Sequence, residues 1–209
     1  MLLARQEKRV NQAAAISWAD YYRETAGRSP RDLFTRALGF LGDTASSDLL
    51  AIDLGCGDGT EVLALLDAGW RVLAIDQEDA ALALLASGVA PDAANRLQVH
   101  AARFETVTFP PADLVYAGLS LFFCPPAAFP AVWSRIRSAL RPGGRFAGHF
   151  LGVRDSWALD PTVTSHTADE VKEMLAGLTV DSFAELEHDS HAVSGPKHWH
   201  LFKVVAQKP

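Results

Sequence analysis

The chain has 209 residues, of which 49% are hydrophobic and 21% charged, and its formal net charge is −6. These values are ordinary for a globular protein and suit one compact domain with a hydrophobic core. The acidic balance and the scattered lysines and arginines argue against a nucleic-acid partner. No apolar run approaches the roughly 20 residues of a membrane-spanning helix, and the early charges in residues 1–9 do not fit a secretory signal. We therefore expect a cytoplasmic protein with no membrane partner, in which Cys56 and Cys124 are buried free thiols.

The N-terminal part of the chain has a helical pattern. It runs from about residue 5 to residue 40, contains the aromatic residues Trp18, Tyr21 and Tyr22, and is broken near Gly27 and at Pro30. We predict a single domain in which residues 1–42 form a helical cap and residues 43–209 form an α/β core.

From residue 49 onward, short apolar runs alternate with helical segments. The runs that predict buried strands are residues 49–53, 71–76, 97–100, 114–117 and 145–151. The predicted helices are residues 60–68, 80–86 and 129–140. Gly69 and Gly88 are expected to end the first two helices, and residues 141–144 are expected to form a tight turn. Such alternation with short connections predicts a parallel sheet covered by helices on both faces.

The C-terminal part is organised differently. A capping box from Thr167 to Glu170 opens a helix that should run to about Leu175. Two strand-like runs follow, residues 180–186 and 198–205, separated only by a turn-rich stretch. Because so short a connection suits a hairpin, the last strand should run antiparallel to the others. The prediction is a doubly wound, Rossmann-like α/β fold with a mostly parallel sheet of about seven strands and an antiparallel last strand.

A glycine-rich segment, residues 53–61, follows the first predicted strand. In open sheets of this kind, ligands bind beyond the carboxyl ends of the strands, and glycines let the backbone approach them closely. Asp76 ends the second strand about 20 residues further on, where a carboxylate can accept both hydroxyls of a ribose. The two features together indicate a ligand that contains adenosine.

The glycine spacing distinguishes between two such ligands. A dinucleotide site requires G-x-G-x-x-G, with a helix N-terminus facing a pyrophosphate. Here the glycines are Gly55, Gly57 and Gly59, so the third one is misplaced. The acids Asp53 and Asp58 would repel a pyrophosphate but suit a ligand with an ammonium and a sulfonium group. The segment therefore favours S-adenosylmethionine over NAD.

Four motifs in this order resemble those of the class I methyltransferases that use S-adenosylmethionine. D-L-G-C-G-D-G-T with the later A-I-D is similar to the first two motifs of that family, and residues 112–117 are similar to its fourth strand. L-R-P-G-G-R-F resembles its turn before the fifth strand. The overall plan resembles small stand-alone enzymes of the tellurite-resistance and trans-aconitate methyltransferase type.

The resemblance implies roles for residues at matching positions. Asp53 and the loop residues Gly55, Cys56 and Gly57 would hold the methionine part of the cofactor. Asp76 would hold the ribose, with Gln77 beside it, and Phe104 and Arg103 would be neighbours of the adenine. The backbone near Gly118 and Leu119 would face the amine. Apart from the resemblance, Tyr21, Tyr22 and Arg28 of the cap are expected to fold over the site and clamp the carboxylate of the cofactor. A capping helix that packs only for stability would account for the tyrosines as well.

Three residues outside the cofactor motifs are candidates for catalysis. Arg154 lies in the loop after the fifth strand, which begins on the ligand side. His198 and His200 share one face of the last strand, where one of them could serve as a general base. Two histidines lack the further ligands of a zinc site, so we expect no metal. Local hydrogen bonding on a polar strand face is the alternative role for the pair.

The sequence thus predicts an enzyme that transfers a methyl group from S-adenosylmethionine to a small molecule by in-line displacement, with S-adenosylhomocysteine as product. A non-catalytic protein that binds the same ligand is one alternative, and an NAD-dependent oxidoreductase is another. The identity of the acceptor, the need for a base and the oligomeric state are open at this point.

Overall fold

The structure, a computed structural model, describes residues 17–42, 49–193 and 195–209. The described part of the cap consists of α2 (Trp18–Thr25) and α3 (Asp32–Leu41). Ser17 caps α2 by accepting the backbone N–H of Asp20 at 3.3 Å. The break between the two helices contains Gly27 and Pro30, as predicted. The predicted helical residues 5–16 lie outside the described part of the chain.

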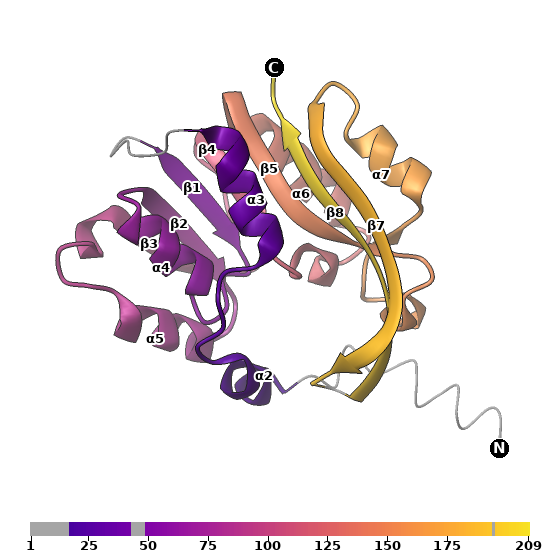
Figure 1. The fold of residues 1–209 in the computed structure, drawn as a ribbon, viewed down its shortest axis with the longest axis horizontal. Helices are drawn as coiled ribbons and strands as arrows, with labels where there is room; N and C mark the ends of the chain where they lie inside the picture. Colours follow the sequence, from indigo (N-terminus) through magenta and orange to yellow (C-terminus); the bar gives the residue numbers. More distant parts are fainter. Residues whose placement is uncertain (1–16, 43–48, 194) are drawn as a thin grey trace.

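The strands form one sheet in the order β3-β2-β1-β4-β5-β8-β7, and the short β6 pairs with β5 (Figure 1). β8 runs antiparallel to both of its neighbours, whereas the pairs from β3 through β5 are parallel. The doubly wound, mostly parallel sheet with an antiparallel last strand is therefore confirmed. The strands are β1 (Leu50–Leu54), β2 (Arg71–Asp76), β3 (Leu97–Ala101), β4 (Ala112–Ala117), β5 (Leu140–Gly152), β6 (Ser165–His166), β7 (Thr179–Ala192) and β8 (Gly195–Gln207).

Helices cover both faces of the sheet because its central strands bury side chains on both sides. The core helices are α4 (Thr60–Asp67), α5 (Asp79–Gly88), α6 (Phe129–Ala139) and α7 (Ala168–Met174). Ile52 and Leu54 of β1 pack in the hydrophobic cluster that includes α6 and α7. Ala51, which points to the other face, packs in the cluster that includes α3, α4 and α5.

Three local features differ from the sequence predictions. The predicted turn at residues 141–144 forms the irregular start of β5, where the register with β4 shifts between Ala112 and Leu114. Gly88 is the last residue of α5 and lacks a positive φ, so it does not end the helix in the left-handed conformation that Gly69 adopts. The final hairpin is longer than predicted and turns between Ala192 and Gly195.

The order of the strands fixes where a ligand can bind. The connections that follow β1 and β4 leave in opposite directions along the sheet, so a crevice opens beyond the carboxyl ends of these two neighbouring strands. In Figure 1, α2 lies on the same side as these strand ends and as the turn of the β7–β8 hairpin. Among the described residues, no helix is both long and apolar enough to cross a membrane.

Candidate functional site

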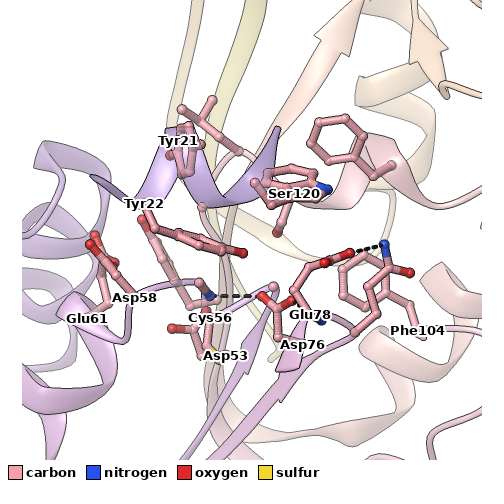
Figure 2. Close-up of a pocket in the computed structure, with 18 of the residues that line it drawn as sticks. Tyr21, Tyr22, Asp53, Cys56, Asp58, Glu61, Asp76, Glu78, Phe104 and Ser120 are labelled. Carbon is pink, nitrogen blue, oxygen red and sulfur yellow. Dashed lines mark hydrogen bonds between the residues drawn. The ribbon is translucent and has the colours of Figure 1, made fainter. Parts of the chain in front are cut away.

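A pocket lies beyond the carboxyl ends of the central strands, and α2 covers it. Figure 2 shows Asp58 and Glu61 on one side of it and Asp76, Glu78 and Phe104 on the other, with Tyr22 between them. Every residue that the sequence predicted to contact the cofactor lines this pocket. Its lining consists of Trp18, Tyr21, Tyr22, Arg28, Arg31, Asp53, Gly55, Cys56, Gly57, Asp58, Glu61, Asp76, Gln77, Glu78, Ala102, Arg103, Phe104, Glu105, Tyr116, Gly118, Leu119, Ser120 and Phe123.

The glycine-rich loop after β1 adopts a conformation that is unfavourable for residues with a side chain. Gly55 has a φ of +75°, and a Cβ atom on it would lie 2.4 Å from the Cβ of Ser120. Gly59 has a φ of +81°, and a Cβ atom on it would lie 2.5 Å from Cδ1 of Leu85. The chain therefore needs glycine at both positions to pass between β1 and α4, which leaves backbone groups of the loop open to the pocket.

Asp53 is a buried carboxylate that has no hydrogen-bond partner in the described part of the chain. Asp53 is only 1% exposed, and neither of its carboxylate oxygens has a hydrogen-bond partner among the described residues. Burial, followed by the neighbouring charges of Glu61 and Asp76, raises the pKa of Asp53 well above its ordinary value. Buried hydrogen-bond acceptors are normally paired, so we expect a ligand to donate to Asp53. A cationic donor fits best because it would also favour the charged form of the Asp53 carboxylate.

Asp76, at the end of β2, connects the loop to the neighbouring strand. Its Oδ2 accepts the backbone N–H of Gly57 at 2.9 Å, and its Oδ1 accepts that of Glu78 at 3.0 Å. Each carboxylate oxygen can accept a second hydrogen bond, so the group can hold the loop and still receive two hydroxyls. Gln77, the next residue, is exposed at the rim of the pocket.

The segment after β3 supplies an apolar ring and a charged pair. The ring of Phe104 lies 3.5 Å from the position that a Cβ of Gly55 would occupy. The backbone carbonyl of Phe104 accepts a hydrogen bond of 2.8 Å from the guanidinium of Arg135, which fixes the segment to α6. Arg103 is exposed and forms an ion pair with Glu105 at 3.0 Å. Phe104 therefore presents a fixed apolar surface beside the loop, and Arg103 lies at its edge.

The turn after β4 is held by two hydrogen bonds. Leu119 has a φ of +59°, which is unfavourable for a residue with a side chain. Its N–H is donated to Nδ1 of the buried His149 at 3.3 Å, and the hydroxyl of Ser120 donates to the carbonyl of Leu54. Burial lowers the pKa of His149 to about 3, so this imidazole stays neutral and can accept. These contacts hold Gly118 and Leu119 in the pocket wall.

The cap contributes an aromatic cover and an ion pair. Tyr22 is 5% exposed, and its ring stacks near that of Trp18 at a centroid distance of 6.2 Å. Arg28 donates two hydrogen bonds of 2.6 Å to the carboxylate of Glu61 and one of 3.3 Å to Asp58. Burial alone would raise the pKa of Glu61, but the hydrogen bonds and charge of Arg28 lower it. Arg28, which was predicted to bind the carboxylate of the ligand, thus binds two carboxylates of the protein instead.

The sequence did not predict several of the residues that line the pocket. Glu61 lies within the glycine-rich motif but received no role, although an acid in the first turn of a helix often has a specific partner. Arg31 donates to the hydroxyl of Tyr21 at 2.8 Å. Ser120 and Phe123 come from the segment after β4, where no sequence pattern marks residues of a site.

The three residues predicted to be catalytic lie together, outside the set that lines the pocket. Arg154 forms ion pairs with Glu185 at 2.8 Å and Glu187 at 2.7 Å. His200 is fully buried, accepts the backbone N–H of Arg154 at 3.1 Å and contacts Glu185 at 2.9 Å. His198 contacts Glu187 at 3.1 Å and a further acid of β7. The two histidines share a strand face, and the contacts seen there are with acids of β7 and the loop after β5.

Comparisons with known proteins agree with the fold and the loop. Residues 51–144, from β1 to the start of β5, match the family described as "Methyltransferase domain". No curated protein sequence matches the chain. TehB from Haemophilus influenzae superimposes with a TM-score of 0.70 at 14% identity, over 92% of this chain and 68% of TehB.

Two further solved structures contain the expected cofactor or its product. The 1,6-didemethyltoxoflavin-N1-methyltransferase of Burkholderia thailandensis, with bound S-adenosylhomocysteine, has a TM-score of 0.63 at 20% identity, over 98% of this chain and 89% of that one. Magnesium protoporphyrin IX methyltransferase of Synechocystis, with bound S-adenosylmethionine, has a TM-score of 0.65 at 14% identity, over 98% and 97% of the two chains. At these identities the likeness establishes the fold.

The donor set of the pocket also fits this cofactor. It offers an unpartnered buried carboxylate for a cationic group, a second carboxylate at the end of β2 for a ribose, and a glycine loop open to a ligand. The match of residues 51–144 to the methyltransferase family and the shared fold agree with such a cofactor.

Proposed function

We propose that the chain is a class I S-adenosylmethionine-dependent methyltransferase that acts on a small-molecule acceptor by direct in-line displacement, with the cofactor held by the residues around the glycine loop. The observation that carries the assignment of the cofactor residues is Asp53, whose two buried oxygens have no partner among the described residues. In the proposed complex Asp53 attracts the ammonium group of the cofactor. Opposite charges brought together in a buried site interact strongly, so this contact makes a large contribution to affinity.

The remaining contacts follow from the positions around the pocket. Asp76 accepts the ribose hydroxyls beside Gln77, and Phe104 packs against the adenine, with Arg103 at the edge. The backbone of Gly55, Cys56 and Gly57 surrounds the methionine part from one side, and that of Gly118 and Leu119 surrounds it from the other. All of these residues line one pocket, which supports their assignment to one ligand.

The carboxylate of the cofactor requires a cation from the cap. Arg28 is engaged by Glu61 and Asp58. Arg31 also lines the pocket, and no ion pair of Arg31 is found among the described residues. We therefore assign the carboxylate to Arg31, with Arg28 as the residue that fixes the segment between α2 and α3. Arginine suits this task because its planar group binds a carboxylate with two parallel hydrogen bonds.

The cofactor supplies a methyl group on a positively charged sulfur, and the protein supplies alignment and a dry environment. Tyr22 and Trp18 cover the pocket and exclude water from its interior. We give Arg154, His198 and His200 no part in the reaction, because the acids of β7 engage them and none of them lines the pocket.

Three observations support a small acceptor. The pocket lies under the cap, where a folded macromolecule could not insert without displacing α2. Two of the solved relatives are named for small substrates, 1,6-didemethyltoxoflavin and magnesium protoporphyrin IX. The protein also has a net negative charge, which opposes binding to a nucleic-acid backbone.

A label-transfer experiment tests this proposal. The purified protein is incubated with methyl-labelled S-adenosylmethionine and separate fractions of a cell extract, one of small molecules, one of proteins and one of nucleic acids. We expect label only in products from the small-molecule fraction, and no transfer by Asp76→Ala. A chiral methyl group should arrive with inverted configuration, since one in-line displacement inverts it. Label in protein or nucleic acid, or retained configuration, would contradict the proposal.

A further inference from the structure

The pocket has an aromatic wall that the cofactor assignment does not use. Trp18 of α2 and Phe123 of the short 3-10 helix after β4 (Leu121–Phe123) both line the pocket. Their ring centroids lie 5.2 Å apart with an interplanar angle of 80°. Both side chains are only half-buried, so part of each ring is open to a ligand.

The wall lies on the half of the pocket opposite to the residues assigned to the ribose and the adenine. Asp76 and Phe104 belong to β2 and to the segment after β3, on one side of β1. Phe123 follows β4, on the other side of β1. An acceptor must approach the methyl group from the half that the ribose and adenine leave free, and that half is bounded by Trp18 and Phe123.

The wall has a rigid backing. Phe123 packs against Trp157 at a centroid distance of 5.9 Å, and Trp157 packs against Trp199 at 5.5 Å. The buried ammonium of Lys197 lies 3.7 Å above the ring of Trp157 and 4.2 Å above that of Trp199, and it is paired with the buried Asp155. Cation–π contacts and a buried ion pair hold Trp157 and Trp199 in place behind Phe123, so the wall presents a preformed corner of two aromatic rings at 80° to each other.

Among the described residues, the same half of the pocket contains no carboxylate, histidine or lysine that could remove a proton from an acceptor. Its residues from β4 onward are Tyr116, Gly118, Leu119, Ser120 and Phe123. All carboxylates that line the pocket belong to β1 or β2 or to the segments that follow β1, β2 and β3. No histidine or lysine is among the described residues of the lining.

Tyr22, Tyr116 and the nearest histidine are unsuited to act as bases. Burial raises the pKa of Tyr22 and of Tyr116, so both phenols keep their protons. His149 is engaged by the N–H of Leu119, and burial lowers its pKa to about 3. An efficient base has a pKa near the working pH, and none of these three groups meets that condition. The acceptor must therefore arrive with a free lone pair.

We propose that the acceptor is a flat aromatic heterocycle that binds against Trp18 and Phe123 and is methylated on a ring nitrogen. This inference rests on the proposed function. The nitrogen lone pair forms the new N–C bond, the C–S bond breaks with its electron pair remaining on sulfur, and the positive charge passes from sulfur to nitrogen. No proton has to move before the transfer, which matches the absence of a base. Stacking on aromatic side chains supplies affinity without a requirement for charge.

Binding to the full chain tests this proposal independently of turnover. Ligand-observed NMR titrations, with S-adenosylhomocysteine at saturation, compare isoquinoline, purine and pteridine with the saturated amine decahydroisoquinoline. We expect at least one flat heterocycle to bind and the saturated amine not to bind. Phe123→Leu and Trp18→Leu remove a ring while keeping apolar bulk, and each should weaken heterocycle binding about threefold to tenfold. Phe40→Leu, a change at an exposed ring of α3, should leave it unchanged.

The affinities for the cofactor and its product test a different role for the two rings. If the rings instead surround the cationic sulfur, Phe123→Leu will weaken S-adenosylmethionine but not the neutral S-adenosylhomocysteine, and heterocycle binding will not change; that result overturns the inference. Failure of all three heterocycles to bind to a protein that binds S-adenosylhomocysteine also overturns it. A wild-type protein that binds neither adenosyl ligand would instead refute the proposed cofactor site.

Discussion

The carboxylate of Asp76 accepts the backbone N–H of Gly57 at 2.9 Å, so the end of β2 holds the loop that follows β1. The residue assigned to the ribose is thereby also the residue that sets the shape of the loop. Since the two roles use the same side chain, its loss should affect ligand affinity and loop geometry together.

Asp76→Ala should therefore weaken binding of S-adenosylhomocysteine by about tenfold or more, because hydrogen bonds to a charged group contribute roughly 1.5–3 kcal/mol. Calorimetric titration measures this loss. Asp79→Ala is the matched control, since it removes the same charge from an exposed position in the first turn of α5. Equal affinities for the Asp76→Ala and wild-type proteins would refute the assignment of Asp76.

Asp53 should couple cofactor binding to the release of a proton. The raised pKa means that the free protein holds a proton on Asp53 at pH values where a free aspartate would not. An ammonium group favours the charged form, so affinity should rise with pH until it passes the raised pKa. Calorimetry in two buffers of different ionisation enthalpy should show proton release by the wild type and none by Asp53→Asn.

The same residue should make the ligand-free protein less stable. Between the ordinary pKa of aspartate and the raised one, the folded chain binds a proton that the unfolded chain releases, so stability falls as pH rises through that window. Asp53→Asn should thus raise the melting temperature of the free protein at neutral pH, by roughly 2–4 °C for each kcal/mol gained. A melting temperature that falls in the variant would contradict the account of an unpartnered buried charge.

Gly55→Ala should destabilise the protein by about 2 kcal/mol or more, because a Cβ there meets Ser120 at 2.4 Å and the φ of +75° costs roughly 1–2 kcal/mol for a residue with a side chain. Gly39→Ala is the control. Gly39 lies inside α3, and a Cβ added to it would have no atom within 4 Å, so alanine should be neutral or stabilising by about 0.5–1 kcal/mol. Thermal melting compares the two variants, and a similar loss in both would show that the loop is not constrained.

Arg28→Ala should cost about 3 kcal/mol, because it leaves the carboxylate of Glu61, only 3% exposed, without its cation. The lowered pKa of Glu61 adds stability that is present above the pKa of an unfolded glutamate and is lost as pH falls through the folded value. The cost should thus be largest near neutral pH and shrink in acid. Arg23→Ala breaks an exposed pair in α2 and should change stability by less than about 1 kcal/mol.

Much of the fold could be predicted because its central strands are buried on both faces. A continuous apolar run such as residues 71–76 indicates a buried parallel strand when a helix follows it after a short connection. β7 was predicted too short because many of its side chains are exposed, and its pairing with β8 continues past Leu186 through charged residues to Ala192. An exposed strand of this kind is held by its hydrogen bonds to the partner strand, and the hydrophobic periodicity of β7 alone does not reveal that pairing.

The sequence also predicted residues that lie together on one half of the pocket, since the glycine loop and Asp76 are close in sequence and each has a local reason for its residue type. The aromatic wall of the other half was not predicted. Phe123 reaches the pocket through a turn after β4, and Arg28 finds Glu61 across 33 residues of sequence. His198 and His200 open the last strand beside the carboxyl end of β5, at the end of the sheet where they were expected, but neither lines the pocket. Their side chains contact acids of β7, and spacing along the chain does not predict such contacts.

Calorimetric titration of the wild-type protein with S-adenosylmethionine, S-adenosylhomocysteine and NAD tests the central claim most directly. The glycine loop with Asp53 and Asp76 predicts micromolar binding of both adenosyl ligands and no binding of NAD. Binding of NAD, or no binding of either adenosyl ligand, would contradict the assignment of the pocket.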